Sequence, residues 1–484
     1  MNSPASLYSN LSPIRDISKL ISSKSLSPVD LIEVTLEQIS KLNPTLNAFI
    51  TILEDSARRE AKEAETSIKE GKYKGPLHGI PISLKDLIYV KGVRSTSGSK
   101  ILSNFVPSYD ATVVRKLKDA GAIIIGMNNT HEFACGLTNI NPHYGSSKNP
   151  WDVSRISGGS SGGSAVAVSA GMASGSIGTD TSGSIRVPSS LCGLFGLKPT
   201  YGRVSKYGVM QLAPSIDHVG PIARSTWDVA AILQAIAGYD ENDGSTINAP
   251  VSDYVSLISE NNDQGAKFKL GIPKEYFFDI IGSKVLRTFE KFIVQLNECG
   301  VSTVVVNLME TDKIFETWKA LRLGESAATH DEWLSSRRHE YGEDVLAMLE
   351  NGKKVNAVDY IKAHAHRQEL KNAFLRSMSG LDGLVVPTTI ITSPKLNQKV
   401  VNINGNDVEV YQALSRLTTV FDVTGLPAIN VPIDLVDGKL PIGAQLIGRP
   451  FDESSILSMA YCYEEYHKIY ERMSPPVIGG IMND

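Results

Sequence analysis

The chain has 484 residues, of which 42% are hydrophobic and 21% are charged, and its formal net charge is −4. These values are typical of an ordinary globular protein and exclude an intrinsically disordered chain. Because the charge is weakly negative and no long run of Lys or Arg occurs, direct binding to nucleic acid or to an anionic membrane is not expected.

The N-terminal part of the chain is helical in pattern from residue 14 to residue 70. Ser27 before Pro28 predicts a helix start, and apolar residues recur after it at near-helical spacing. The Ala-rich and charged stretch 55–69 is typical of a solvated helix. We therefore expect an N-terminal helical segment over residues 1–70.

Short apolar runs bounded by Gly or Pro follow, at residues 79–84 and 122–126, and they are typical of buried strands. Residues 112–120 lie between these runs and have helical periodicity. Strand, helix and strand in this order predict βαβ units and a mostly parallel sheet with helices on both faces. Residues 310–380 are helical in pattern and rich in charge, which predicts a peripheral helical layer.

The scattered cysteines show no CxxC spacing, which argues against a zinc ribbon and a disulfide scaffold. Buried thiols in a reducing compartment are the expected alternative. The start of the chain has no apolar core that would suit a signal peptide, and no run approaches about 18 apolar residues. A cytoplasmic protein without a membrane segment is therefore expected. These four cysteines are Cys135, Cys192, Cys299 and Cys462.

Residues 157–164 read SGGSSGGS, a composition that by itself favours a flexible linker. The stretch continues directly into the small apolar residues 165–170, which suit a tightly packed helix. The alternative is a loop whose backbone approaches a ligand at a helix N-terminus. A GxSxG pattern at 158–162 matches a hydrolase nucleophile elbow, but the polar residues 149–155 stand where that motif needs a buried strand.

A second turn of small residues, 178–186, could direct consecutive backbone N–H groups at one point, as in an oxyanion hole. Asp180 and Arg186 flank this turn and are expected to form a structural pair. A hydroxyl nucleophile needs a base, and none of the nine histidines lies in a motif that marks one. Lys85 ends an apolar strand, where burial would lower its pKa; an ion pair with Asp86 is an equally open alternative.

Three segments are Gly79-Ile80-Pro81 followed by Lys85-Asp86, then residues 158–164, then residues 178–186. Taken together and in this order, they resemble the amidase signature family. Two later stretches, 192–205 and 425–432, look like the same family, so that the resemblance covers about residues 15 to 470. It implies a single α/β/α catalytic domain, here residues 71–484, with a large mixed sheet.

The resemblance also implies a Ser-cisSer-Lys triad that hydrolyses amides through an acyl-enzyme, without a metal or a cofactor. Lys85 matches the base, Ser160 the bridging serine with a cis peptide bond, and Ser184 the nucleophile. Ser182 stands where the family usually has Gly, and a positive φ would strain it there. The implied oxyanion hole consists of the backbone N–H groups of Thr181, Ser182, Gly183 and Ser184, and the implied supporting residues are Ser161, Asp180 and Arg186.

The motifs leave open which member of the family this is. The sequence favours a free-standing amidase that acts on a small-molecule amide. The alternative is the glutaminase (A) subunit of a glutamyl-tRNA(Gln) or aspartyl-tRNA(Asn) amidotransferase, in which an acid about ten positions before the Gly-Leu-Pro turn contacts the substrate amino group; here that position is Ser415. Residues 344–352 also look more like general amidases.

Two further expectations remain, one about activity and one about assembly. A non-catalytic binding protein on the same scaffold is a more distant alternative, which the retention of all three triad residue types disfavours. The N-terminal helices, lying outside the catalytic motifs, suggest a possible homodimer.

Overall fold

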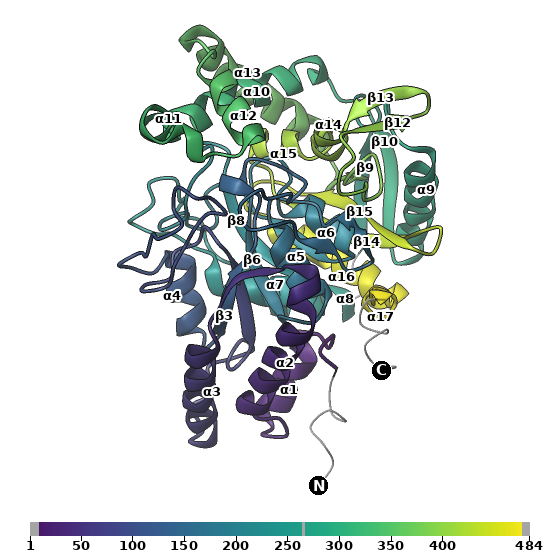
Figure 1. The fold of residues 1–484 in the computed structure, drawn as a ribbon. Coiled ribbons are helices and arrows are strands. Elements are labelled where there is room, and N and C mark those ends of the chain that lie inside the picture. The colour runs from purple at the N-terminus through teal and green to yellow at the C-terminus, as the bar shows by residue number, and fades with distance from the viewer. Residues whose placement is uncertain (1–8, 264–266, 477–484) are drawn as a thin grey trace.

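A sheet of 11 strands runs through the middle of the molecule (Figure 1). The computed structural model describes residues 9–263 and 267–476. The first eight residues, for which no signal peptide was expected, lie outside the described residues. The strand order is β1-β3-β2-β6-β8-β7-β14-β15-β11-β9-β10. The strands are β1 (Phe49–Ile52), β2 (Pro81–Lys85), β3 (Ile123–Asn128), β6 (Gly175–Asp180), β7 (Phe195–Lys198), β8 (His218–Ala223), β9 (Phe268–Pro273), β10 (Val301–Val306), β11 (Gly383–Pro387), β14 (Ala428–Val436) and β15 (Leu440–Ile447).

The sheet is mixed, as expected, but the expectation of mostly parallel strands is wrong. Four neighbouring pairs are parallel and six are antiparallel. The βαβ prediction is confirmed for β2 and β3, which are parallel neighbours on either side of α4 (Thr112–Asp119). The prediction of βαβ units is wrong in the centre of the sheet, where β14 and β15 form an antiparallel hairpin. Strands buried on both faces are continuous apolar runs in either direction, so their texture does not reveal direction.

Helices cover both faces of the sheet, and alternate residues of β3 distinguish the two faces. Ile123 and Ile125 pack in a cluster with α5 (Gly162–Ser169), whereas Ile124 packs in a second cluster with α7 (Thr226–Ile236). The α5 face also carries α6 (Arg186–Cys192). The α7 face carries α8 (Tyr254–Asp263), α9 (Ser283–Glu298) and α16 (Glu453–His467).

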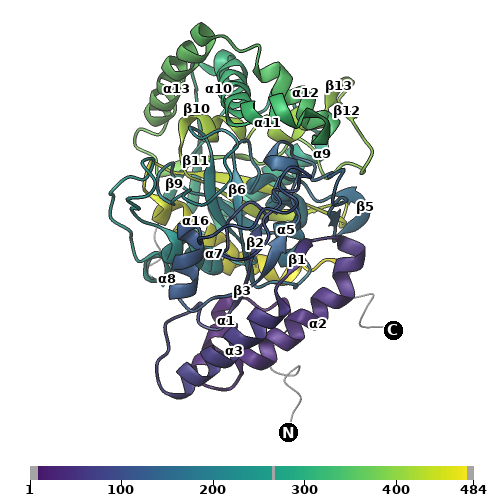
Figure 2. The same ribbon diagram turned by 60° about the vertical axis from the view of Figure 1, so that its left-hand side comes forward.

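The N-terminal segment is helical with one interruption that the pattern did not predict. Helices α1 (Ile14–Ser22), α2 (Pro28–Leu46) and α3 (Glu54–Lys69) lie together at one end of the molecule (Figure 2). Ser27 caps α2, as expected, by accepting a hydrogen bond from the Val29 N–H. The correction is β1, which follows α2 and pairs antiparallel with β3 as an edge strand. Residues 1–70 therefore contribute a strand to the same sheet as residues 71–484.

A layer of helices over residues 310–380 lies at the opposite end (Figures 1 and 2). Its first helix, α10, packs on α12, α13 and α15 and turns the buried side chains of Trp318 and Arg322 inward. The layer is therefore peripheral to the sheet but reaches the interior. Its helices are α10 (Ile314–Thr329), α11 (Asp331–Ser336), α12 (Glu343–Gly352) and α13 (Ala357–Ser377).

Within residues 9–263 and 267–476, no helix combines the length and the apolar run needed to cross a bilayer.

The remaining elements are short. Two small antiparallel sheets pair β4 (Lys148–Asn149) with β5 (Asp152–Ile156) and β12 (Val400–Ile403) with β13 (Asn406–Glu409). The remaining helices include α14 (Val410–Ser415), α15 (Thr419–Thr424) and α17 (Ile469–Arg472).

The buried carboxylate of Asp228 on α7 holds the first turn of α1 by accepting hydrogen bonds from the Ile14 and Arg15 N–H groups. Because Asp228→Ala leaves both donors without this acceptor, we expect the free energy of unfolding to fall by about 1–2 kcal/mol in urea denaturation. The control Asp16→Ala alters an exposed carboxylate on α1, and we expect a change of no more than about 0.5 kcal/mol. Equal effects of the two substitutions would contradict this anchoring.

Candidate functional site

Lys85 is the last residue of β2, and its side chain is fully buried. Its Nζ donates hydrogen bonds to Ser160 Oγ and Thr179 Oγ1, both at 2.7 Å. The alternative ion pair with Asp86 is not formed, because the Asp86 carboxylate accepts hydrogen bonds from the N–H and hydroxyl of Thr96. Burial lowers the pKa of Lys85 to about 7, so a large fraction of this amine is neutral at pH 7.

Ser160 lies in a packed loop that leads into α5, and the linker interpretation of residues 157–164 is wrong. The whole stretch is buried, and the Gly159–Ser160 peptide bond is cis. The Ser160 carbonyl accepts hydrogen bonds from Thr130 Oγ1 at 3.0 Å and from the His131 N–H at 3.2 Å. A Cβ on Gly163 would lie 2.4 Å from the Asn129 carbonyl oxygen. Glycine is therefore needed there for close packing and not for chain flexibility.

The second turn is organised around the Asp180 carboxylate. It accepts hydrogen bonds from the N–H groups of Gly183 at 2.6 Å and Ile185 at 3.0 Å, and it pairs with Arg186 at 3.0 Å. The Arg186 guanidinium also contacts Asp422 at 2.7 Å, and all three ionic side chains are fully buried. Burial disfavours the ionised Asp180 carboxylate, but the effect of the Arg186 guanidinium is larger. It holds the pKa of Asp180 well below its usual range.

The nucleophile candidate Ser184 follows Gly183, the residue that carries the positive φ (+115°) of this turn. A Cβ on Gly183 would lie 2.4 Å from Thr418 Oγ1, so only glycine fits. Ser182 is not the left-handed position, and the strain considered for it does not arise. The Ser182 carbonyl accepts from Thr418 Oγ1 at 2.6 Å, and its hydroxyl accepts from Trp318 Nε1 at 3.0 Å.

The expected oxyanion hole needs one correction. The Gly183 N–H donates to Asp180 Oδ1 and is not free for a substrate oxygen in this structure. Among the described residues, the N–H groups of Thr181, Ser182 and Ser184 have no protein acceptor. These three remain as candidate donors. Ser184 Oγ likewise makes no hydrogen bond with the described part of the chain, so the step from Ser160 to Ser184 is not formed as a hydrogen bond here.

Sequence reasoning missed several residues that surround the candidate triad. Thr179, a second hydrogen-bond acceptor for Lys85, lies inside the motif at 178–186 and could have been noticed there. Thr418 and Trp318, which donate hydrogen bonds to Ser182, come from distant segments, and no local pattern connects them to it. Among the described residues, no group of three or more His, Cys, Asp or Glu side chains could hold a metal ion.

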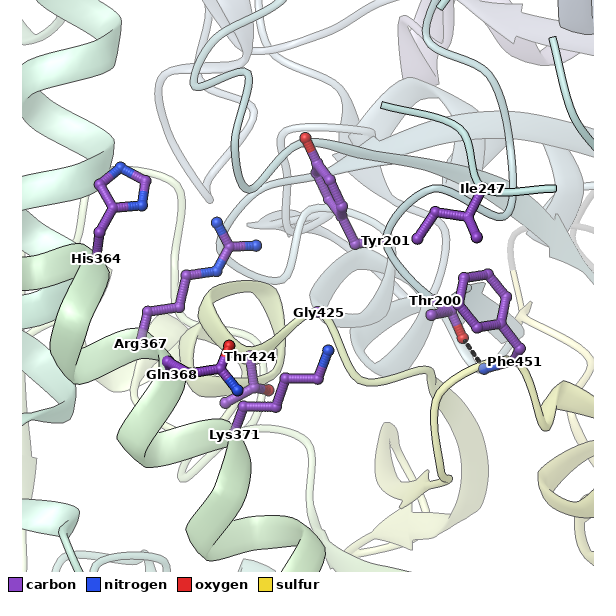
Figure 3. Close-up of a pocket in the computed structure, with 10 residues that line it drawn as sticks. All are labelled: Thr200, Tyr201, Ile247, His364, Arg367, Gln368, Lys371, Thr424, Gly425 and Phe451. Atoms are coloured by element: carbon purple, nitrogen blue, oxygen red, sulfur yellow. Dashed lines mark hydrogen bonds between the residues drawn. The ribbon is translucent and has the colours of Figure 1, made fainter. Parts of the chain in front are cut away.

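A pocket of about 290 Å³ lies elsewhere, between α13 and the turn that follows β7 (Figure 3). In it, the Arg367 guanidinium stands 5.5 Å from the centre of the Tyr201 ring. None of Lys85, Ser160 and Ser184 lines this pocket, so it is not where an amide would meet Ser184. Its lining residues are Thr200, Tyr201, Ile247, His364, Arg367, Gln368, Lys371, Thr424, Gly425 and Phe451.

Known proteins resemble this chain over almost its whole length. The A subunit of the glutamyl-tRNA(Gln) amidotransferase of Coxiella burnetii (strain Dugway 5J108-111) is 37% identical over 483 residues, which cover 94% of this chain and 98% of that protein. Among solved structures, the peptide amidase from Stenotrophomonas maltophilia is 30% identical with a TM-score of 0.82, over 94% of this chain and 97% of that one. A chain of a vestigial protein complex that reveals the evolutionary origins of an s-triazine catabolic enzyme is 31% identical with a TM-score of 0.89, over 94% and 98%.

A protein-family model described as Amidase matches residues 30–457. The match includes the three segments that contain Lys85, Ser160 and Ser184. The chain belongs to the amidase family.

Proposed function

We propose that this chain hydrolyses a carboxamide to the carboxylic acid and ammonia or an amine, with Ser184 as nucleophile, Ser160 as proton relay and Lys85 as base. One observation carries the proposal: the buried Lys85 amine donates to Ser160 Oγ at 2.7 Å, and among the described residues no carboxylate accepts a hydrogen bond from it. A base is most effective when its pKa lies near the working pH. The lowered pKa of Lys85 meets that condition.

The reaction has two halves in this proposal. Neutral Lys85 takes the Ser160 hydroxyl proton, Ser160 takes the Ser184 proton, and Ser184 Oγ attacks the amide carbon. The carbonyl oxygen becomes an oxyanion, for which the N–H groups of Thr181, Ser182 and Ser184 are the candidate donors. The Lys85 proton then returns through Ser160 to the leaving nitrogen as the C–N bond breaks. Water, deprotonated by the same relay, hydrolyses the acyl–Ser184 ester and frees the acid.

The relay requires Ser184 Oγ to approach Ser160 Oγ when substrate binds. Catalytic hydrogen bonds are often long or absent without substrate and form in the complex. The Ser161 N–H already donates to the Ser184 carbonyl at 3.2 Å, so the two serine segments are joined through their backbones. A rotation of the Ser184 side chain is the movement that the proposal needs.

A second candidate is the A subunit of an amidotransferase, in which the ammonia passes to a partner protein. The 37% identity to the Coxiella burnetii protein over 94% of this chain favours this setting over the free-standing enzyme that the sequence favoured. The similarity to a chain of a protein complex also favours a partner. Ser415, where the amidotransferase is expected to have an acid, is the feature that speaks against glutamine as substrate. A homodimer remains a prediction.

Ammonia release by the purified chain separates the two candidates. The free-standing enzyme is supported by turnover of simple aliphatic or aryl amides by the chain alone. Turnover of glutamine only, and only after a partner protein is added, supports the amidotransferase candidate.

Replacement of the nucleophile tests the chemistry common to both candidates. We expect Ser184→Ala to lower kcat/KM for any accepted amide by at least about 10³-fold and to abolish labelling by a fluorophosphonate probe. The matched control is Ser189→Ala, which removes a buried serine hydroxyl that donates to the Ile185 carbonyl; we expect it to retain both activity and labelling. Labelling that survives in Ser184→Ala would overturn the assignment of the nucleophile.

The pH dependence tests the base. The ammonium form of Lys85 cannot accept a proton, so kcat/KM should fall as pH falls through about 7, the value to which burial lowers the pKa of Lys85. Above that pH the amine is neutral and the rate should level off. Lys85→Ala should lose about 10²–10⁴-fold in rate and should lose the inflection near pH 7.

Lys198 provides the control for this profile, because burial lowers its pKa to about 7 as well. It donates to the Pro199 carbonyl and has no place in the proposed relay. We expect Lys198→Met to keep the inflection. An inflection that disappears in Lys198→Met and persists in Lys85→Ala would show that Lys85 is not the base.

A further inference from the structure

The pocket between α13 and the turn after β7 is lined by basic side chains and by no acid (Figure 3). His364, Arg367 and Lys371 extend into its cavity of about 290 Å³ from one face of α13. None of the described residues that line it is Asp or Glu. The chain as a whole has a formal net charge of −4, so the pocket has the opposite sign to the rest of the molecule. A concave site lined by positive charge attracts anions.

The two strongest bases of the pocket lack a counter-charge. Neither the Arg367 guanidinium nor the Lys371 ammonium makes an ion pair or a side-chain hydrogen bond within the described part of the chain. Burial lowers the pKa of both groups, and the charge of Arg367 lowers that of Lys371 further. The carboxylate that acts on Arg367 is that of Glu325, but its oxygens accept hydrogen bonds from the Ser215 N–H and the Tyr360 hydroxyl. Like charges four residues apart on a helix repel each other, so an anion between them would relieve the repulsion and supply the missing charge.

A buried hydroxyl with an unused hydrogen lies on the other side of the pocket. Thr200 is 4% exposed and lines the cavity. Its Oγ1 accepts a hydrogen bond from the Phe451 N–H at 2.8 Å, and the hydroxyl hydrogen has no acceptor among the described residues. Buried polar groups are normally hydrogen-bonded. Thr200 is therefore available as a neutral donor to a ligand.

The position of the guanidinium and an apolar wall further restrict the ligand. The central carbon of the Arg367 guanidinium lies 5.5 Å from the centre of the Tyr201 ring, which holds the charge in one place. Ile247 and Phe451 line the side of the cavity that faces α13 (Figure 3). The pocket thus has a cationic side and an apolar side, and it suits an anion with an organic part.

The number of donors favours a phosphate over a carboxylate. An arginine fork alone satisfies a carboxylate, which would leave Lys371 unpaired. A phosphate monoester carries close to two negative charges at neutral pH and has three strongly accepting oxygens. These oxygens suit a guanidinium, an ammonium and a hydroxyl together. Because ligand pockets usually measure roughly 300–1,000 Å³, this cavity suits only a small molecule.

We infer that this pocket binds a small phosphate monoester, with its phosphoryl group at Arg367 and Lys371 and its organic part against Ile247 and Phe451. The ligand is distinct from the amide, because none of the candidate catalytic residues lines the pocket. The inference is therefore independent of the proposed function. Binding can be measured without turnover, so that failure of one leaves the other intact.

The first test is calorimetric titration of the wild-type chain with phenyl phosphate at about 0.15 M salt. We expect saturable binding with a Kd below about 1 mM. Inorganic phosphate, which lacks the organic part, and benzoate, which has one charge on a planar carboxylate, should each bind at least about tenfold more weakly. Absence of saturable binding would overturn the site, and benzoate binding as tightly as phenyl phosphate would overturn the ligand class.

The second test removes the two bases. We expect Arg367→Met/Lys371→Met to raise the Kd for phenyl phosphate at least about 100-fold, because both charged donors are lost. The matched control is Lys362→Met/Arg376→Met, which also removes one Lys and one Arg from α13. These two side chains are exposed and line other pockets, and we expect the Kd to stay within about threefold. Equal losses in the two variants would indicate attraction to the overall charge and would overturn the site.

The third test locates the ligand in the unaltered protein and does not depend on whether a variant folds. Burial and the Arg367 charge lower the pKa of His364, and a bound dianion beside it should raise that pKa and shift its ring signals in NMR spectra. The signals are assigned by their loss in His364→Gln. Binding of phenyl phosphate that leaves the His364 signals unchanged would place the ligand elsewhere and would overturn the inference.

Discussion

The desolvation of the Lys85 amine is the constraint on which the candidate site depends. The side chain is fully buried at the end of β2, and two hydroxyl oxygens, Ser160 Oγ and Thr179 Oγ1, are its hydrogen-bond acceptors. A carboxylate partner in the same place would stabilise the ammonium form and remove the base. Because the two acceptors are uncharged, burial dominates and favours the neutral amine. In the proposed mechanism, this buried position is the reason that Lys85 can accept a proton from a serine.

The rest of the candidate site holds the two serine segments in place. The Asp180 carboxylate accepts hydrogen bonds from three backbone N–H groups, those of Gly183, Ile185 and Arg186, and pairs with the Arg186 guanidinium, which fixes the turn that contains Ser184. Thr418 supports the same turn by donating a hydrogen bond to the Ser182 carbonyl. Buried charges are tolerated in this cluster because they are paired with one another and hydrogen-bonded.

Much of the chemistry could be predicted from the sequence, because it lies in short motifs. Residues 158–164 and 178–186 contain the proposed relay serine, the proposed nucleophile and their supporting pair, and glycines such as Gly163 and Gly183 mark close approaches of the backbone. The helical layer at 310–380 was also predictable from its helical pattern, and the cap at Ser27 from its place directly before Pro28. These features depend on neighbours along the chain.

Features that depend on distant segments could not be predicted. The direction of a strand such as β14 or β15 depends on which segments become its neighbours in the sheet. Buried strands carry the same apolar pattern in either direction. The edge strand β1 is only four residues long and lies between two helices. The contact of Trp318 with Ser182 joins residues 136 positions apart. The hydrogen bond from the Gly183 N–H to the Asp180 carboxylate depends on the folded turn, and the composition does not predict it.

The most direct test of the central claim is the titration of Lys85 itself. In protein with isotopically labelled lysine, the Lys85 side-chain signal can be assigned by its loss in Lys85→Met and followed by NMR as pH is varied. We expect it to titrate near 7, the value that burial gives the pKa of Lys85. A titration near the ordinary lysine value of 10.5 would mean that the amine is charged at neutral pH, and it would contradict the role of Lys85 as the base.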